Sequence, residues 1–380
     1  MKRFFFPTEL YSAPGSIREM ARFIKPEDKV LLITDRMLVK LGLAKRVTDV
    51  IDGVGAKVEV FDDVPANPHA DCVNSALEKA KTMGATAIVC LGGGSPMDVA
   101  KVVAMLMTNE GTWEQYQWEG RKPEKAPLPY IAIPTTAGTG SEASKTSVII
   151  DRDTKKGVGG DFFFAKVTLI DPELMVSLPP FVTATTGMDA LTHAIEAYVG
   201  RSNHPFTNAL ALEAISLLTK YLPVAYENGA DLEAREMVAL AASMAGLAMD
   251  QSGLGVIHSM SGPLSSHYNV AHGLSNAVLL PCGMRYNVET VPERYARVAE
   301  ALGVNTYGIS ALEAGMRGIE KVEELCTLMK IPTNLCEYFR EEEDICKFAD
   351  EACKMFLMRN NPRTPQQSEI EELFAGVLKA

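Results

Sequence analysis

The sequence predicts an α/β domain followed by an all-helical domain. Up to residue 171, short runs of β-branched and other apolar residues alternate with helical stretches, a pattern typical of a mostly parallel sheet with helices packed on it. After Pro179 these runs stop, and apolar residues recur at helical spacing instead. Pro179, Pro180 and Gly187 punctuate the chain at this point, so we expect an α/β domain at 1–181 and an all-helical domain at 182–380.

The same signals place the individual elements. We expect strands at 30–35, 57–61, 86–94, 130–136, 147–151 and 167–171. The long helices should include residues 205–222, 232–251 and 341–358, in which apolar residues recur every three or four positions.

Composition narrows the class of protein. The chain has 380 residues, 47% of them hydrophobic, which is enough for the cores of two ordinary domains. Its formal net charge is −11 and it has no basic patch with interleaved aromatic residues, so we expect no nucleic-acid partner. Seven cysteines without a CxxC pair argue against a disulfide framework and a thiolate zinc site. No apolar run has the length of a membrane span and the first residues do not resemble a signal peptide, so we expect a cytoplasmic protein without a membrane partner.

Four residues predict a metal site in the helical half. Asp189 and His193 are four positions apart, which on a helix places both side chains on one face about one turn apart. His258 and His272 lie in the other histidine-rich stretch of a chain that has six histidines. Any one of these residues alone would more often be a polar side chain satisfied within a helix. Together, three imidazoles and one carboxylate suit a divalent transition metal.

The run TAIVCLGGGSPMDVAK predicts a dinucleotide-binding turn between a buried strand and a helix. Gly92, Gly93 and Gly94 lack a Cβ and allow the backbone to approach a ligand. The residues from Ser95 to Asp98 begin a helix whose free N–H groups favour a pyrophosphate. The alternative is an ordinary turn in which Ser95 caps the helix. The run is not a GxGxxG fingerprint.

Two further strand ends carry candidate cofactor contacts. Asp35 ends the strand at 30–35, where a carboxylate can accept hydrogen bonds from a ribose and repel a 2′-phosphate, which favours NAD over NADP. A helix N-cap is an equally good interpretation of Asp35. Thr135, Thr136 and Thr139 lie at and just after the end of the expected strand at 130–136. They can hydrogen-bond a phosphate or a nicotinamide amide, although such loops are often only turns.

Four blocks together resemble one family. They are GGGSPMDVAK, IPTTAGTGSE, GMDALTHAIEAY and the segment from His258 to His272. In this order and spacing they resemble the iron-dependent (group III) alcohol dehydrogenases, the family of lactaldehyde reductase and butanol dehydrogenases, over essentially the whole chain. The resemblance implies a dehydroquinate synthase-like fold, in which a Rossmann-like NAD-binding domain faces a helical metal domain across a cleft. It also implies a homodimer or larger homo-oligomer.

The resemblance extends to individual residues. It implies that Asp189, His193, His258 and His272 are the metal ligands, that Gly94, Ser95 and Asp98 lie on the pyrophosphate loop, and that Asp35, Asn67, Thr135, Thr136 and Lys155 contact NAD. Gly93 and Thr139 are added as cofactor-binding candidates from the loops in which they lie. The chain departs from many relatives at Gly262, where they carry a histidine near the substrate, and it has His267 five residues later. Gly262 should either enlarge the substrate pocket or relax a helix, and His267 should either contact substrate or lie on the surface.

These features predict an NAD-dependent oxidoreductase of small aldehydes and primary alcohols, working in the reductive direction by family analogy, with the metal as Lewis acid. The resemblance favours Fe(II), although the ligand set also suits Zn(II). The rival is a metal- and NAD-dependent lyase or synthase of the dehydroquinate synthase type. A phosphorylated acid would require basic residues beside the ligands, and the segments 187–200 and 253–281 contain no Lys or Arg. The exact substrate is left open, an anionic aldehyde included.

Overall fold

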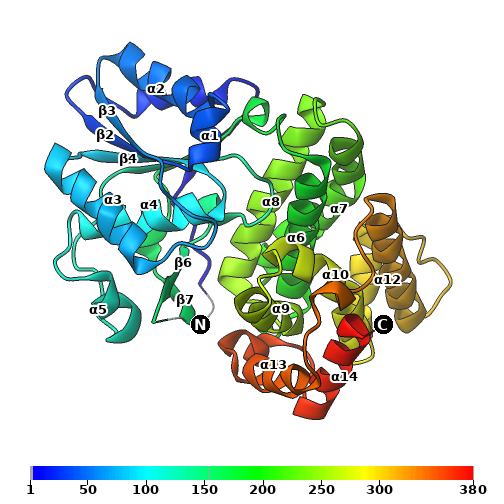
Figure 1. Cartoon of the computed structure of the whole chain (residues 1–380). Helices are drawn as coiled ribbons and strands as arrows, with labels where there is room; N and C mark the ends of the chain where they lie inside the picture. The colour runs from blue at the N-terminus through cyan, green and yellow to red at the C-terminus, as the bar shows by residue number, and fades with distance from the viewer. Residues whose placement is uncertain (1–2, 153, 380) are drawn as a thin grey trace. The chain divides into compact units, whose positions relative to one another are not determined.

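The chain divides into two compact units (Figure 1). The computed structural model describes residues 3–152 and 154–379. For Lys155 it describes the backbone but not the side chain. The α/β unit is Phe5–Ser177, and the helical unit is Leu178–Ala380 together with Met1–Phe4. Pro179 and Pro180 begin the first long helix of the helical unit, because proline suits the first turn of a helix. The division therefore falls a few residues before the position expected from the sequence.

A six-stranded parallel sheet forms the centre of the α/β unit, with the strand order β1-β8-β5-β4-β2-β3. The strands are β1 (Glu9–Ser12), β2 (Lys29–Ile33), β3 (Lys57–Phe61), β4 (Ala87–Gly92), β5 (Tyr130–Pro134) and β8 (Val167–Ile170). Every residue of β4 and β5 is buried, as expected for strands that are covered on both faces. The predicted parallel sheet is confirmed, and five of the six expected strands lie in it.

Two strands differ from the expectation. The run at 147–151 forms β6 (Thr146–Asp151), which pairs antiparallel with β7 (Thr154–Gly159) in a separate two-stranded sheet. Only two residues separate β6 from β7, and so short a connection allows an antiparallel hairpin but not a parallel crossover. Strand β1 was not predicted, because its sequence ELYS has no apolar run.

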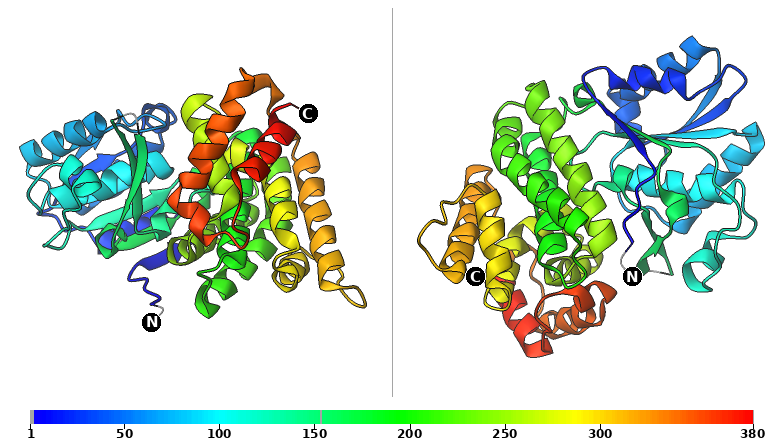
Figure 2. Two further views of the ribbon diagram at one scale, coloured as in Figure 1. Left: turned by 90° about the horizontal axis from the view of Figure 1, so that it is seen from below. Right: turned by 180° about the vertical axis from the view of Figure 1, so that it is seen from behind.

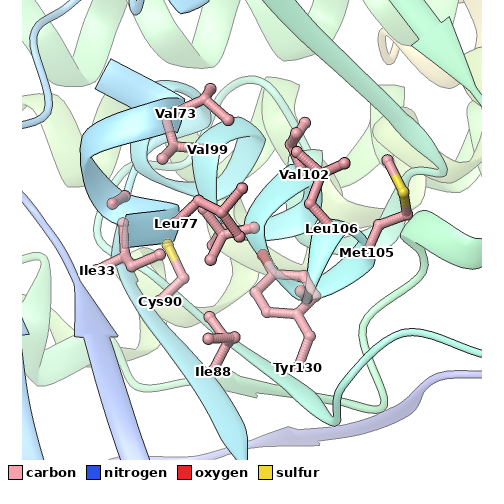
Figure 3. Close-up of a cluster of buried hydrophobic side chains, with 14 of the residues drawn as sticks. Ile33, Val73, Leu77, Ile88, Cys90, Val99, Val102, Met105, Leu106 and Tyr130 are labelled. Atoms are coloured by element: carbon pink, nitrogen blue, oxygen red, sulfur yellow. The ribbon is translucent and has the colours of Figure 1, made fainter. Parts of the chain in front are cut away.

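Helices cover both faces of the parallel sheet (Figure 1). They are α1 (Arg36–Lys40), α2 (Leu43–Val54), α3 (Ala70–Met83), α4 (Gly94–Leu106) and α5 (Trp113–Trp118). Side chains alternate along β2, so that Leu31 and Ile33 belong to the core under α3 and α4, whereas Val30 and Leu32 belong to the core under α2. Figure 3 shows the first of these cores, where Leu77 of α3 lies among the side chains of β4 and α4.

The helical unit contains α6 (Pro180–Val199), α7 (Pro205–Glu227), α8 (Leu232–Ser252), α9 (Val256–His267), α10 (His272–Val288), α11 (Pro292–Ala301), α12 (Ala311–Leu328), α13 (Glu342–Lys354) and α14 (Gln367–Leu378). Helix α6 packs against α7, α8 and α10 (Figure 2). Among the described residues, α7 alone is long and apolar enough to cross a membrane, and it lies along α6 and α8. All residues from 187 to 199 of α6 are buried, so the polar residues of this helix need partners inside the unit.

Candidate metal centre and cofactor loops

Three helices bring predicted metal ligands together. Asp189 and His193 lie on α6, His258 lies in the first turn of α9, and His272 begins α10. One ligand atom each from Asp189, His258 and His272 lie within 4.8 Å of one another. Nε2 of His258 lies 3.6 Å and Nε2 of His272 lies 3.8 Å from Oδ1 of Asp189. Two atoms that are each about 2 Å from one ion can be up to about 4 Å apart, so a single ion can span these separations.

His193 lies beside this three-residue cluster. Its Nε2 atom is 3.8 Å from Oδ1 of Asp189, and its ring stacks on that of His258 with centroids 4.7 Å apart and an interplanar angle of 21°. Among the described residues, the group of ligand atoms that lie within 4.8 Å of one another comprises those of Asp189, His258 and His272. The role of His193 as a fourth ligand therefore stays a prediction.

Glu196 of α6 orients His258. Its Oε2 atom is 2.6 Å from Nδ1 of His258, and its Oε1 atom accepts a hydrogen bond of 2.8 Å from the backbone nitrogen of Ile257. Because a carboxylate only accepts, Nδ1 of His258 carries a hydrogen, and in the neutral imidazole Nε2 is the nitrogen that presents its lone pair to the cluster. The sequence interpretation missed Glu196, although it lies three residues after His193 on the same helix.

A chain of hydroxyl groups orients His272 in the same way. Ser275 donates to the backbone carbonyl of His272 at 2.9 Å, and its Oγ lies 2.6 Å from Oγ of Ser261. Ser261 therefore donates to Ser275 and accepts from Nδ1 of His272, 3.2 Å away. This leaves Nε2 of His272 with its lone pair directed toward Asp189.

The cluster favours positive charge. Burial raises the pKa of Asp189, but the imidazoles of His193, His272 and His258 outweigh it and hold that pKa well below its usual range. Burial lowers the pKa of His258, but the carboxylates of Asp189 and Glu196 together have the larger effect and raise it to about 9. A cation at this position is therefore stabilised by the groups around it.

The donor set fits a divalent metal. Asp189 and Glu196 are only 2% and 3% exposed, and the segments 187–200 and 253–281 around the cluster contain no Lys or Arg. Two buried carboxylates need positive charge beside them, which a divalent cation would supply. Imidazole nitrogen and carboxylate oxygen are ligands that Fe(II) and Zn(II) accept.

In the α/β unit, predicted cofactor residues lie at the carboxyl ends of neighbouring strands. The chain runs from β2 to β3 on one side and then returns to β4 on the other side of β2. The strand order therefore reverses between β2 and β4. Asp35 follows β2 and Gly92 ends β4, so both flank this switch point, where open α/β sheets bind their ligands.

Close approach between two loops explains the glycines that follow β4. A Cβ atom on Gly93 would lie 2.9 Å from Oγ1 of Thr136, and one on Gly94 would lie 3.1 Å from Cγ2 of Thr139. Any side chain would push the loops apart. The glycine turn and the threonine loop, two separate motifs in the sequence, thus form one continuous surface.

Asp35 acts as a helix cap in the structure. Its Oδ1 atom accepts hydrogen bonds from the backbone nitrogens of Met37, at 2.9 Å, and Leu38, at 3.0 Å, at the start of α1. This is the N-cap interpretation that the sequence allowed. A ribose contact of the same carboxylate stays a prediction.

Asp98 and Lys101 of α4 hold the threonine loop in place. Asp98, expected on the pyrophosphate loop, accepts hydrogen bonds from Oγ of Ser141 and from a backbone nitrogen of β6, both at 3.1 Å. Lys101 is 1% exposed, and its Nζ donates to Oγ of Ser141 at 2.8 Å, Oγ of Ser144 at 3.1 Å and the carbonyl of Thr146 at 2.8 Å. All three N–H groups of the ammonium thus have acceptors, which makes its burial tolerable. The sequence interpretation missed Lys101.

The remaining cofactor candidates lie around the same turn. The hydroxyl of Ser95 donates to the backbone carbonyl of Ala66, the residue before Asn67. This hydrogen bond brings Asn67 close to the glycine turn. The backbone nitrogen of Thr135 donates to the carbonyl of Gly92 at 3.1 Å. The side chain of Lys155 lies outside the described part of the chain.

Gly262 and His267 of α9 lie against the region of α13. Gly262 contacts Met355, which follows α13, and His267 contacts α13 itself. A Cβ atom on Gly262 would lie 3.0 Å from Sδ of Met355, so the glycine lets this side chain pack against α9. Nε2 of His267 lies 2.9 Å from a carboxylate oxygen of Glu351, and its ring stacks on Phe348 with centroids 5.2 Å apart. These contacts account for His267 without a substrate, and substrate roles for either residue stay predictions.

Known proteins place the chain in a family. Residues 7–172 match the family model for iron-containing alcohol dehydrogenase, and residues 183–378 match that for the Fe-containing alcohol dehydrogenase family, C-terminal. The chain is 37% identical to the NAD-dependent methanol dehydrogenase of Bacillus methanolicus over 100% of both chains, and 36% identical to lactaldehyde reductase of Escherichia coli (strain K12) over 91% of both. A crystal structure of 1,3-propanediol oxidoreductase is 34% identical and superposes with a TM-score of 0.95, covering 100% of both chains.

The resemblance predicted from the four sequence blocks is thereby confirmed, as is the combination of an α/β domain and a helical domain in a dehydroquinate synthase-like fold. The lyase alternative is not favoured, because the matched models and relatives are those of alcohol dehydrogenases and reductases. The chain belongs to the iron-containing alcohol dehydrogenase family and is an oxidoreductase.

Proposed function

We propose that the protein is a metal-dependent, NAD(H)-linked enzyme that interconverts a small aldehyde and its primary alcohol, and that it reduces the aldehyde in the cell. The main support is the convergence of Oδ1 of Asp189 with Nε2 of His258 and of His272, on chain segments (187–200 and 253–281) that contain no Lys or Arg. A relative named as an NAD-dependent methanol dehydrogenase and one named as a lactaldehyde reductase support the cofactor and the size of the substrate.

Asp189, His258 and His272, with His193 as the fourth ligand, would hold one divalent metal, Fe(II) first and Zn(II) second. A bound metal supplies Lewis acidity to the substrate oxygen. Glu196 holds the proton on Nδ1 of His258, so Nε2 is the nitrogen that would bind the metal. Cation binding would therefore displace a proton from Nε2 of His258, while the proton on Nδ1 would stay with Glu196.

The glycine turn and the threonine loop would bind NAD(H), which supplies or accepts the hydride when bound. The backbone N–H groups of Gly94 and Ser95 at the start of α4 would bind the pyrophosphate. Oδ1 of Asp35 caps α1, so Oδ2 is the oxygen that would accept hydrogen bonds from the ribose. Asn67, Thr135, Thr136, Thr139 and Lys155 would complete the contacts.

The substrate is a neutral short-chain aldehyde in this proposal, since the metal-ligand segments carry no basic residue. An anionic aldehyde would have to use a more distant group such as Arg201, whose guanidinium already donates to the carbonyl of Pro362 and to Thr364. We further propose a homodimer or larger homo-oligomer in the cytoplasm.

Substituting the ligands tests the function. His258→Ala or His272→Ala should remove most of the bound metal and nearly all turnover while leaving NADH binding intact, because the NAD residues lie in the other unit. His267→Ala on the same helix α9 is the matched control and should keep its metal. Activity is measured with NADH and a panel of short aldehydes after anaerobic reconstitution with Fe(II) or Zn(II). Full metal content and full rate in His258→Ala would refute the proposed centre.

A further inference from the structure

Asn276 of α10 contacts three ligand atoms of the cluster at once. Its Nδ2 atom lies 2.6 Å from Oδ1 of Asp189, 3.0 Å from Nε2 of His258 and 3.2 Å from Nε2 of His272. It follows His272 by four residues, which places both side chains on one face of the helix. No role of Asn276 follows from the sequence motifs.

The chemistry of these contacts is that of a donor among acceptors. The atom 2.6 Å from the carboxylate of Asp189 is the amide nitrogen, because two oxygens at this distance would repel each other. When His258 carries one proton, that proton lies on Nδ1 beside Glu196, and Nε2 then carries a lone pair. The amide of Asn276 has two hydrogens, so it can donate to two of these three atoms at a time, and their lone pairs are those that a metal ion would use.

Among the described residues, the hydrogen bonds of this amide are made by its nitrogen and not by its oxygen. Oδ1 of Asn276 is buried and has no hydrogen-bond partner among the described residues. A buried amide oxygen without a partner is unfavourable and is retained where other contacts outweigh it. In Asn276 those contacts are the hydrogen bonds from Nδ2 to the ligand atoms. The side chain is therefore positioned by the metal-binding atoms themselves.

We propose that Asn276 competes with the metal for its ligand atoms and thereby sets the affinity of the site. The inference rests on the proposed metal centre. The NH₂ group and a cation cannot use the same lone pairs, so metal binding must break the hydrogen bonds of Asn276. Those bonds keep the carboxylate and the imidazoles close together when they hold no cation, and their loss on metal binding makes the bound metal easier to exchange.

Two substitutions of nearly equal size separate competition from packing. Asn276→Leu removes the donor, so the ligand atoms lose their partner in the metal-depleted protein but not in the metal-loaded one. The affinity for the metal should then rise by about tenfold, because the lost hydrogen bonds no longer oppose binding. Asn276→Asp places a second carboxylate beside Asp189 and should raise the affinity further, while it lowers the stability of the metal-depleted protein.

The assay titrates the metal-depleted full chain with Co(II) and with Zn(II), and measures urea unfolding with and without metal. The wild type and His258→Ala are the references. Tighter binding by both variants, with unfolding changes confined to the metal-depleted protein, supports the proposal. Unchanged or weaker binding by Asn276→Leu overturns it, and so does an equal loss of stability in both forms. Should the wild type and His258→Ala bind metal equally, the metal centre itself would be wrong, which is a separate failure.

Discussion

Replacing Glu196 by glutamine tests how the protein orients His258. Each carboxylate oxygen of Glu196 accepts one hydrogen bond, from Nδ1 of His258 at 2.6 Å and from the backbone nitrogen of Ile257 at 2.8 Å. A glutamine side chain has the same shape but only one oxygen that accepts. In Glu196→Gln the NH₂ group must therefore face one of the two donors.

Either arrangement is unfavourable. A buried donor that faces another donor costs about 1–3 kcal/mol. If the oxygen stays with Ile257, the hydrogen of His258 must move to Nε2, which removes the lone pair that a metal would use. If the oxygen turns to His258, the first turn of α9 loses its acceptor, and the neutral amide leaves the imidazole less basic. We expect the metal affinity to fall by about 10- to 100-fold, which corresponds to about 1.4–2.8 kcal/mol.

The measurement compares two glutamate–histidine pairs of the same protein. Metal-depleted Glu196→Gln is titrated with Co(II) or Zn(II), and urea unfolding is followed in parallel. Glu351→Gln is the matched control, because Glu351 contacts His267 at 2.9 Å but is 39% exposed, and such exposed pairs contribute little. If Glu196→Gln bound metal and unfolded as Glu351→Gln does, the assigned tautomer of His258 and its dependence on Glu196 would be wrong.

The remaining predictions concern the loops and Gly262. Lys101→Met should lower the free energy of unfolding by about 1–3 kcal/mol, because three acceptors beside the threonine loop lose their donor. It should also weaken NADH binding in a fluorescence titration. Unchanged NADH affinity would make Lys101 purely structural. Gly262→Leu should displace Met355 and change the preference between short and bulky aldehydes more than the affinity for NADH. Gly376→Leu, at a helical glycine with no atom within 4 Å of its Cβ position, is the control that should leave both unchanged. Asp35→Asn keeps a helix cap but removes the charge, so it should shift the ratio of kcat/KM values toward NADPH by roughly tenfold, and no shift would mean that Asp35 is only a cap.

Four of the five correctly predicted sheet strands lie inside the sheet, and the fifth, β3, lies at its edge. Strands β4 and β5 are buried on both faces and therefore read as continuous apolar runs. Strand β6 gave a similar local signal, but its partner is decided by the chain that follows it, which returns at once as β7. Strand β1 lies at the edge of the sheet, where fewer positions need an apolar side chain.

The candidate site was predictable where spacing along one helix carries it. The four-residue step from Asp189 to His193 is such a signal. Glu196 and Asn276 have comparable spacing from a histidine, but glutamate and asparagine are common in helices and neither residue suggests a site by itself. Their contacts cross from α6 to α9 and from α10 to α6, and such contacts become visible only when the helices are packed.

The polar groups of α6 link the stability of the helical unit to the metal. Asp189 and Glu196 lie on a helix that is buried all round in this part, and a buried carboxylate without compensation costs several kcal/mol. The hydrogen bonds from Asn276 and from the backbone of Ile257 offset part of that cost. A divalent cation would offset more of it, since it would interact directly with Asp189 and, through His258, with Glu196. The residues that set the metal affinity are thus the same residues that set the stability of α6. Substitutions at Glu196 and Asn276 must therefore be measured with and without metal before a change is assigned to metal affinity or to stability.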